Sequence, residues 1–334
     1  MTRANATDQE QSNVPDPLIT VLMPVYNGTK FLNEQVESIL SQDGVSVRLQ
    51  IIDDASTDGS AELLKGMTDN DPRIHVATNP RNLGLIPTIG LLLRTVRTDF
   101  FALADQDDIW DTSKLSRSVS ALENSGASLI YSDVRLIDEH GEQTSNSYLK
   151  SRKIAVAEGH DVLPFIFRNP AIGHTLVGRA ELAQVTADIP TFLRFHEPWI
   201  VAGACSQHGV NFLNETTGSY RVHSTNVIGP ATTNSVLRLA RGLSKKHLEA
   251  RHQTRSRALR AVTHFRPDLQ PLSDLMLSPP MARLRGTNRL LVALRSAPPI
   301  DQRHAFVEAL LFALAAMRGI AGGERVAPSF ESQQ

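Results

Sequence analysis

The chain of 334 residues has a single cysteine, few aromatic residues and no long apolar run. One cysteine, Cys205, excludes a disulfide framework and a multi-cysteine zinc site, and it fits a reducing compartment. The longest clean apolar run, residues 309–317, is about half the length that a spanning helix needs. Residues 1–17 are polar and lack the apolar core of a signal peptide. We therefore expect a cytoplasmic protein with a disordered tail at residues 1–17.

The chain also lacks a large net charge, which is −1 at pH 7. The charge is unevenly spread, because residues 231–334 hold 16 Lys and Arg against 7 Asp and Glu, whereas residues 1–230 hold 18 against 28. Leucines interleave with the basic residues of 238–266, which favours a helix that lies on an anionic membrane surface or packs on the rest of the protein. Since Phe265 is the single Phe, Tyr or Trp among residues 238–266 and the rest of the chain is acidic, we expect no nucleic-acid partner.

Several motifs of common enzyme classes are missing. Neither G-x-G-x-x-G nor the P-loop G-x-x-x-x-G-K-[ST] occurs, which argues against a dinucleotide oxidoreductase and a P-loop NTPase. No G-x-S-x-G elbow supports a hydrolase. A nucleotide would therefore have to be held by carboxylates, backbone amides and a metal ion.

What is present is a regular alternation of strand and helix patterns. Short apolar, β-branched runs predict strands at residues 18–23, 47–52, 73–77, 100–104 and 128–133, and helical periodicity predicts helices at 29–42, 56–67, 82–96 and 113–124. This order implies βαβ units and a mostly parallel sheet flanked by helices. Beyond it we expect a strand with a glycine turn at 169–179, a helix at 196–208 and a strand-to-loop segment at 218–229. Residues 18–230 then form an α/β domain, and 231–334 form a basic helical region.

Two acidic clusters follow predicted strands. Asp53 and Asp54 follow the second strand, where a carboxylate can accept hydrogen bonds from a base or a ribose. Asp105, Asp107 and Asp108 follow the fourth strand, and hard carboxylate ligands so close together suit Mg²⁺ or Mn²⁺. Taken alone, each cluster is also compatible with a solvated turn that caps the next helix.

The order of four blocks adds a resemblance to a known family. The blocks Pro24–Gly28, Ile52–Asp58, Asn82–Gly84 and Ala104–Trp110 together resemble the family 2 glycosyltransferases with the GT-A fold. Three later blocks, Gly173–Thr175, His196–Trp199 and Tyr220–Asn226, are similar to the subgroup described as rhamnosyltransferase-like. The resemblance covers roughly residues 18–229 and implies a Rossmann-like GT-A catalytic domain.

The resemblance also implies roles for single residues. The donor nucleotide would be bound by Pro24, Tyr26, Asn27, Asp54, Asp105 and Arg221, and a divalent metal ion, Mg²⁺ or Mn²⁺, by Asp107, Asp105 and His223. Asp108 is a neighbour of this set. Glu197 would be the catalytic base, with His196 as its structural partner, and His174 stays outside the catalytic set. The subgroup commonly has Asp where this chain has Glu197 followed by Pro198, and the Glu carboxylate reaches one methylene further toward the acceptor.

The function implied is an inverting transfer of a sugar from a nucleoside-diphosphate sugar, with dTDP-rhamnose as one candidate, to a hydroxyl of a glycan or lipid-linked acceptor. The setting would be cell-surface polysaccharide biosynthesis at the inner face of the plasma membrane. Two alternatives remain open. A nucleotidyltransferase would also use acidic residues and Mg²⁺, and Asp53 and Asp54 after a strand are compatible with a phosphate-receiver signalling module.

Overall fold

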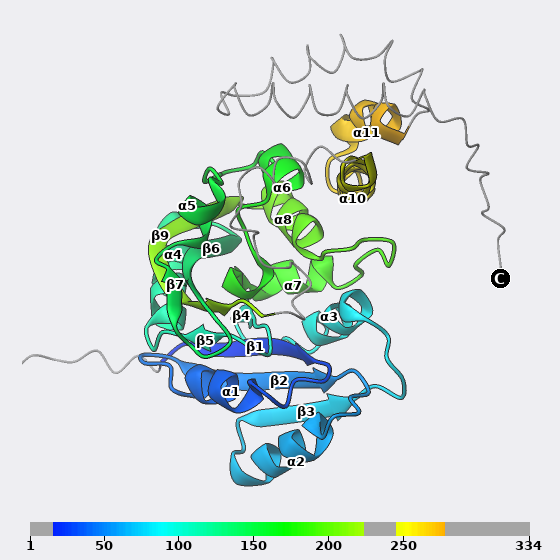
Figure 1. Cartoon of the computed structure of the whole chain (residues 1–334). Coiled ribbons are helices and arrows are strands. Elements are labelled where there is room, and N and C mark those ends of the chain that lie inside the picture. The colour runs from blue at the N-terminus through cyan, green and yellow to red at the C-terminus, as the bar shows by residue number, and fades with distance from the viewer. Residues whose placement is uncertain (1–15, 224–244, 278–334) are drawn as a thin grey trace, which may run out of the picture.

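The computed structural model describes residues 16–223 and 245–277 of the chain. Its centre is a nine-stranded sheet with the order β3-β2-β1-β4-β8-β6-β9-β5, and β7 pairs with β6 at the side (Figure 1). The strands are β1 (Leu18–Val25), β2 (Ser46–Asp53), β3 (Ile74–Thr78), β4 (Phe100–Leu103), β5 (Ile109–Trp110), β6 (Leu129–Ile137), β7 (Gln143–Ser145), β8 (Val177–Arg179) and β9 (Val210–Arg221).

Helices cover both faces of this sheet. They are α1 (Leu32–Leu40), α2 (Ser60–Asn70), α3 (Leu85–Leu93), α4 (Lys114–Ser125), α5 (Tyr148–Arg152), α6 (Leu163–Arg168), α7 (Ala180–Thr186), α8 (Glu197–Ser206), α10 (Lys245–Val262) and α11 (Gln270–Leu277), with 3₁₀ turns η1 (Gly173–Thr175) and η2 (Pro267–Leu269). One core cluster joins β1 to α1, α2 and α4, and another joins it to α3, α7 and α8. The predicted α/β fold with flanking helices is therefore confirmed.

The first part of the sheet is parallel. β1 pairs in parallel with β2 and with β4, and β2 pairs in parallel with β3. Ile19, Val21 and Met23 on one face of β1 and Leu22 on the other are all completely buried. Because helices cover both faces, the strand is a continuous apolar run, and this is why its pattern is visible in the sequence.

The second part of the sheet is mixed. β8 runs antiparallel to β4 and to β6, β9 runs parallel to β6, and β5 runs antiparallel to β9. The strand predicted at residues 169–179 is wrong for most of its length, since η1 occupies its middle and only Val177–Arg179 form a strand, β8. β9 was predicted only from residue 218, because its earlier part is polar and half-buried. The loop predicted beyond residue 223 lies outside the described residues.

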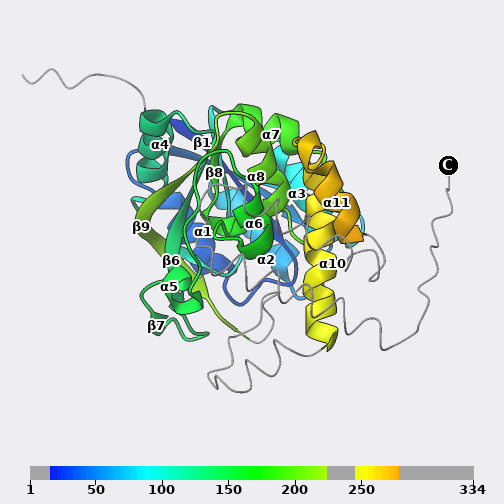
Figure 2. The same cartoon turned by 90° about the horizontal axis from the view of Figure 1, so that it is seen from above.

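Part of the basic C-terminal region packs on the sheet domain. Ala258, Leu259 and Val262 of α10 are buried in the same core cluster as α8, and Trp199 of α8 contacts the ring of Phe265. Figure 2 shows α10 and α11 beside α8 at one side of the molecule. The rest of the predicted region 231–334, like the predicted tail, lies almost wholly outside the described residues. No helix within 16–223 and 245–277 is long and apolar enough to cross a bilayer.

Candidate functional site

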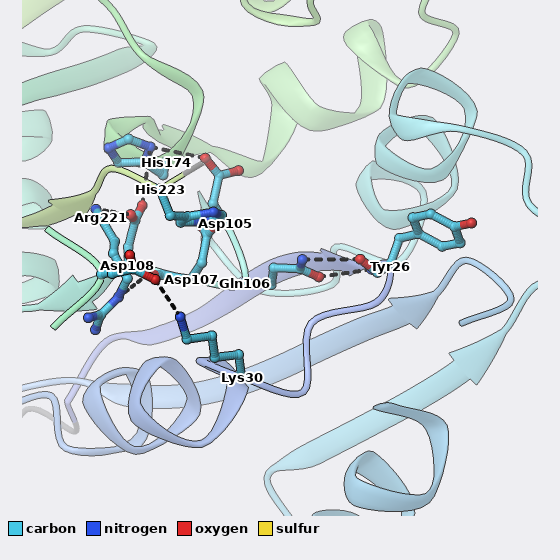
Figure 3. Close-up of polar contacts among 10 residues, drawn as sticks. Tyr26, Lys30, Asp105, Gln106, Asp107, Asp108, His174, Arg221 and His223 are labelled. Atoms are coloured by element: carbon cyan, nitrogen blue, oxygen red, sulfur yellow. Dashed lines mark hydrogen bonds and ion pairs between the residues drawn. The ribbon is translucent and has the colours of Figure 1, made fainter. Parts of the chain in front are cut away.

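The predicted site residues gather at one edge of the sheet. Pro24 lies near the end of β1, Asp54 follows β2, and Asp105 follows β4 within two residues. Parallel strands bring their carboxyl ends to the same edge, which is where ligands bind in open α/β sheets. Figure 3 shows the three carboxylates of residues 105–108 among His174, His223 and Arg221, with Gln106 bound to Tyr26.

Tyr26 is anchored by its backbone, and its ring is left exposed. Its N–H donates to Oε1 of Gln106 at 2.8 Å, and Nε2 of Gln106 donates to the carbonyl of Tyr26 at 3.1 Å. Gly28 permits this close approach, because a Cβ at Gly28 would lie 2.6 Å from Oε1 of Gln106. With 47% of its surface exposed, Tyr26 can offer its ring as a stacking face for a nucleotide base.

Asn27 connects the loops that follow β1 and β2. It has a positive φ of 51°, which asparagine tolerates better than most residues. Its N–H donates to the hydroxyl of Ser56, and its Oδ1 accepts from the N–H of Thr57 at 2.8 Å. Because its Oδ1 already accepts a hydrogen bond from Thr57, the Asn27 side chain stabilises the conformation of the predicted nucleotide-binding loop.

Asp54 is almost completely buried and is engaged by three N–H donors. It accepts hydrogen bonds from Nδ2 of Asn79 at 2.7 Å, from the N–H of Leu83 at 2.9 Å and from the N–H of Gly84 at 2.8 Å. A carboxylate in this arrangement stabilises the turn that leads into α3. Both oxygens of this predicted nucleotide ligand therefore already accept bonds from the chain itself.

The second acidic cluster is partnered mainly by histidines. Nδ1 of His174 lies 3.1 Å from Oδ2 of Asp105 and 3.3 Å from Oδ2 of Asp108, and Nε2 of His223 lies 2.8 Å from Oδ2 of Asp107. Exposure differs along the loop: 42% of the Asp105 side chain is exposed, against 15% for Asp107 and 1% for Asp108. Asp105 and Asp107 are thus the members that a ligand can reach most easily.

Crowding shifts the acidity of this cluster. Burial raises the pKa of Asp108 to about 7, with His174 opposing the shift and Asp107 and Asp105 adding to it. Burial and the neighbouring Asp105 also raise the pKa of Asp107, against the hydrogen bond with His223. Burial acts to lower the pKa of His174, but Asp108 and Asp105 outweigh it and the pKa is raised. The raised pKa values show that the cluster has excess negative charge, which a proton or a bound cation would reduce.

The residues fit a divalent cation. Asp105, Asp108 and His174 each offer a ligand atom, and these atoms lie within 4.8 Å of one another. The set predicted from the sequence was Asp107, Asp105 and His223. The structure divides the loop, because Asp107 faces His223 whereas Asp105 and Asp108 face His174. Carboxylates and imidazole are suitable ligands for Mn²⁺, and carboxylates for Mg²⁺.

Arg221 supports the same loop. Its backbone N–H donates to Oδ1 of Asp108 at 3.0 Å, and its Nε donates to the carbonyl of Asp107 at 3.0 Å. The guanidinium also pairs with Glu34 of α1 and lies 4.4 Å from the ring centroid of Phe31. The residue is 2% exposed, so its role in this structure is to hold the acidic loop in place.

Glu197 begins α8 beside the turn that carries His174. The residue is 6% exposed, and no described residue donates a hydrogen bond to its Oε2. Nδ1 of His196 lies 3.9 Å from this atom. A Cβ at Gly173 would lie 2.7 Å from Nε2 of His196 and 3.6 Å from Oε1 of Glu197. The turn η1 therefore lies between the predicted base and the acidic cluster: Gly173 is close to Glu197, and His174 contacts Asp105 and Asp108.

The carboxylate of Asp133 is occupied. It accepts hydrogen bonds from the hydroxyl of Ser147 and from the N–H groups of Val134 and Leu149. This carboxylate thus secures the start of α5. Oε2 of Glu197 accepts no hydrogen bond from the described residues, and it shares this property with Oδ1 of Asp53 and Oδ2 of Asp108.

Several residues of the site were missed from the sequence. His174 was left outside the predicted set, although the block Gly173–Thr175 was a usable signal. Gln106 and Lys114 were not predicted to have a role, and a lone lysine at the start of a helix has no pattern that distinguishes it. Glu34 and Phe31, which contact Arg221, lie on a helix whose periodicity indicates only packing.

Comparisons with known proteins agree with this geometry. Residues 20–185 match the family model described as glycosyl transferase family 2. An uncharacterized glycosyltransferase of Haemophilus influenzae is 30% identical over 127 residues, which are 38% of this chain and 51% of that protein. The UDP-Glc:alpha-D-GlcNAc-diphosphoundecaprenol beta-1,3-glucosyltransferase WfgD of Escherichia coli is 28% identical over 125 residues, 37% of this chain and 49% of that protein. The chain thus spans about half the length of the curated relatives it matches.

Solved structures extend the comparison of the fold. The crystal structure of S. aureus TarS 1-349 in complex with UDP-GlcNAc has a TM-score of 0.55 to this chain. The likeness covers 91% of this chain and 83% of that one at 14% identity. The predicted GT-A-type α/β fold is confirmed by this likeness.

Proposed function

We propose that this chain, whose residues 20–185 match the glycosyl transferase family 2 model, transfers a sugar from a nucleoside-diphosphate sugar to a hydroxyl group. The observation that carries the proposal is the loop Asp105–Asp108 at the carboxyl end of β4, held by His174, His223 and Arg221. It supplies concentrated negative charge, and its Gln106 binds the backbone of Tyr26, in a chain without a glycine-rich phosphate loop.

The donor lies along this edge in the proposal. Tyr26 stacks on the base, and the loop formed by Pro24, Asn27 and Asp54 shapes the nucleotide pocket. Asp105, with its exposed carboxylate, accepts from the ribose or supports the metal ion. Asp107, Asp105 and His223 would hold Mg²⁺ or Mn²⁺, which would supply positive charge for the leaving diphosphate. Arg221 keeps Asp107 and Asp108 in position for this task.

Glu197 is the general base of the proposed reaction. A hydroxyl is a poor nucleophile, so a carboxylate must accept its proton during attack on the anomeric carbon. Oε2 of Glu197 is buried and accepts no hydrogen bond from the described residues, so an acceptor hydroxyl that reaches it would meet no competing donor there. The attack forms the new C–O bond as the bond to the diphosphate breaks, and a single displacement of this kind inverts the anomeric configuration.

The acceptor belongs to a cell-surface glycan or its lipid-linked precursor in this proposal. The support is the similarity to the E. coli enzyme, whose name describes glucosyl transfer to a diphosphoundecaprenol-linked sugar. The donors to test first are UDP-glucose, for the same reason, and dTDP-rhamnose, because of the three blocks that are similar to the rhamnosyltransferase-like subgroup.

A donor panel tests the function. The purified chain is titrated with UDP-glucose, UDP-N-acetylglucosamine, GDP-mannose and dTDP-rhamnose, with Mn²⁺ or with EDTA, and nucleoside-diphosphate release is followed in the presence of hydroxyl acceptors. We expect one donor to bind in a metal-dependent manner and to release its diphosphate, with an inverted linkage seen by NMR. If no donor binds with Mn²⁺, the proposal is wrong.

The same assay separates the alternatives. A nucleotidyltransferase would instead release pyrophosphate from a nucleoside triphosphate and a sugar phosphate. A receiver module would be labelled by a small phosphodonor such as acetyl phosphate. The structure disfavours the receiver, because Asp53 is 1% and Asp54 4% exposed and Asp54 is occupied by three N–H donors.

A further inference from the structure

A lysine that the proposed reaction does not use is completely buried close to the acidic loop. Lys114, the first residue of α4, is 1% exposed. Its Nζ donates to the carbonyl oxygen of His174 at 2.8 Å and lies 4.3 Å from the ring centroid of Trp110. Lysine is almost never fully buried without a compensating partner, since the desolvated ammonium is costly. A methionine would fill this volume without that cost, so the charge itself needs an explanation.

The surroundings of Lys114 are strongly acidic. Burial lowers the pKa of Lys114 to about 8, whereas Asp108, Asp111 and Asp105 act to raise it. Two of these three carboxylates belong to the acidic cluster. The ammonium therefore lies where it offsets part of the negative charge of that cluster from inside the protein.

The hydrogen bond of Lys114 also fixes the turn that carries His174. Within η1 the N–H of Thr175 bonds to the carbonyl of Ile172, and the N–H of Leu176 bonds to the carbonyl of Gly173. The next residue, Val177, starts β8 and pairs with the neighbouring strands. The carbonyl of His174 thus lies at the end of the turn, where helical carbonyls lose their usual partner, and Lys114 satisfies it.

Residues of η1 contact both parts of the site, the acidic cluster through His174 and the predicted base through Gly173. The imidazole of His174 contacts Asp105 and Asp108 through Nδ1 and stacks on the ring of Tyr220 at 4.9 Å. The preceding residue, Gly173, packs against His196 and Glu197 so closely that a Cβ would lie 2.7 Å from Nε2 of His196. A displacement of η1 would move both the acidic cluster and the base.

We propose that Lys114 is a positioning residue of the transfer reaction: it holds η1 through the carbonyl of His174 and so keeps the imidazole of His174 against Asp105 and Asp108. This inference rests on the proposed function. It concerns a residue that contacts neither donor nor acceptor, and it acts through His174.

The test uses the full chain with Lys114→Met, Lys114→Arg and the control Lys65→Met, which makes the same chemical change at an exposed position of α2. Binding of UDP, GDP and dTDP in the presence of Mn²⁺ is measured by calorimetry, and Tm is measured for each variant. We expect Lys114→Met to weaken Mn²⁺-dependent binding of the preferred nucleotide about tenfold or more. Lys114→Arg should recover part of this loss, and Lys65→Met should match the wild type.

A double mutant shows whether Lys114 acts through His174. In a His174→Ala background, Lys114→Met should cause a much smaller further loss of binding than it does alone. Full additivity would contradict the inference, as would wild-type binding and turnover in folded Lys114→Met. If Lys114→Met does not fold, Lys114→Arg decides: reduced Mn²⁺-dependent binding at a wild-type Tm supports the positioning role, and wild-type binding overturns it. Failure of the wild type itself to bind any of the nucleotides would instead count against the proposed function.

Discussion

Two acidic loops of this protein look alike in the sequence and differ in the structure. Asp53 and Asp54 follow β2, and Asp105 to Asp108 follow β4, at the same edge of the sheet. Asp54 accepts three hydrogen bonds from N–H groups of its own chain, whereas Asp107 and Asp108 face histidines and have raised pKa values. The two loops thus differ in how many N–H donors the chain supplies to their carboxylates. The first loop uses its charge to fold a turn, and in the proposed function the second loop presents its charge to a metal ion.

The largest effect is expected at Asp107. Asp107→Asn removes a negative charge from the loop that faces His223, so Mn²⁺-dependent donor binding should weaken strongly and turnover should fall by about 10³-fold or more. Asp69→Asn, an exposed change near the end of α2, is the matched control. Calorimetry with Mn²⁺ and steady-state turnover check the result. Normal metal-dependent turnover in Asp107→Asn would show that the metal is held elsewhere.

The next effect concerns Glu197. Glu197→Gln keeps size and hydrogen bonding but cannot take a proton at neutral pH, so turnover should fall by about 10²–10⁴-fold while donor binding persists. Glu181→Gln in the first turn of α7 makes the same change at an equivalent helix position and should match the wild type. Glu197→Asp should retain partial activity, because the shorter side chain withdraws the carboxylate from the acceptor. Wild-type turnover in Glu197→Gln would require a different base.

The strands of the parallel part were predictable from their apolar residues. Those predicted at 18–23, 47–52, 73–77 and 100–104 agree within about two residues with β1 to β4. β1 and β4 are buried on both faces and almost wholly apolar, whereas β2 begins with alternating buried and exposed residues and β3 is partly exposed. The mixed part was not predictable in the same way. β9 is polar and half-buried, β5 has two residues, and β8 is defined by its partners β4 and β6 and not by its own three residues.

The site residues also fall into two groups: those that a short sequence motif reveals, and those that only the fold brings together. Short motifs in the sequence point to the acidic residues of 105–108 and to His223, and the structure places Asp107 against His223. The contacts of His174 with Asp105 and of Lys114 with His174 join residues that are 69 and 60 positions apart. No local pattern encodes such distant contacts. The role of the buried Lys114 can be inferred only from the structure, in which the fold brings the carbonyl of His174 to its ammonium group.

A third prediction tests the loop after β2. Asp54→Asn replaces a charged acceptor of three N–H groups by an amide that can accept at only one atom, so the free energy of unfolding should fall by about 2 kcal/mol. Urea unfolding measures this loss. The affinity for Mn²⁺ should stay close to that of the wild type, because Asp54 does not belong to the loop after β4. A large loss of Mn²⁺ affinity without a loss of stability would reverse the comparison of the two loops.

The smallest effect is expected at Asp58, which joins the loop before α1 to the start of α2. Its carboxylate accepts from the N–H and hydroxyl of Thr29 at 3.1 and 2.8 Å and from the N–H and hydroxyl of Ser60 at 3.0 and 2.6 Å. Burial acts to raise the pKa of Asp58, but these hydrogen bonds outweigh it and lower the pKa from 3.8 to about 2. A lowered pKa means that the stabilisation is complete above pH 4 and is lost as the pH falls toward 2.

Because the side chain is exposed to solvent, we expect Asp58→Asn to cost no more than about 1 kcal/mol at pH 7. The difference from the wild type, measured by urea unfolding, should shrink between pH 5 and pH 3, while that of Asp69→Asn stays constant. A difference for Asp58→Asn that is independent of pH would show that the ionised carboxylate does not stabilise this junction.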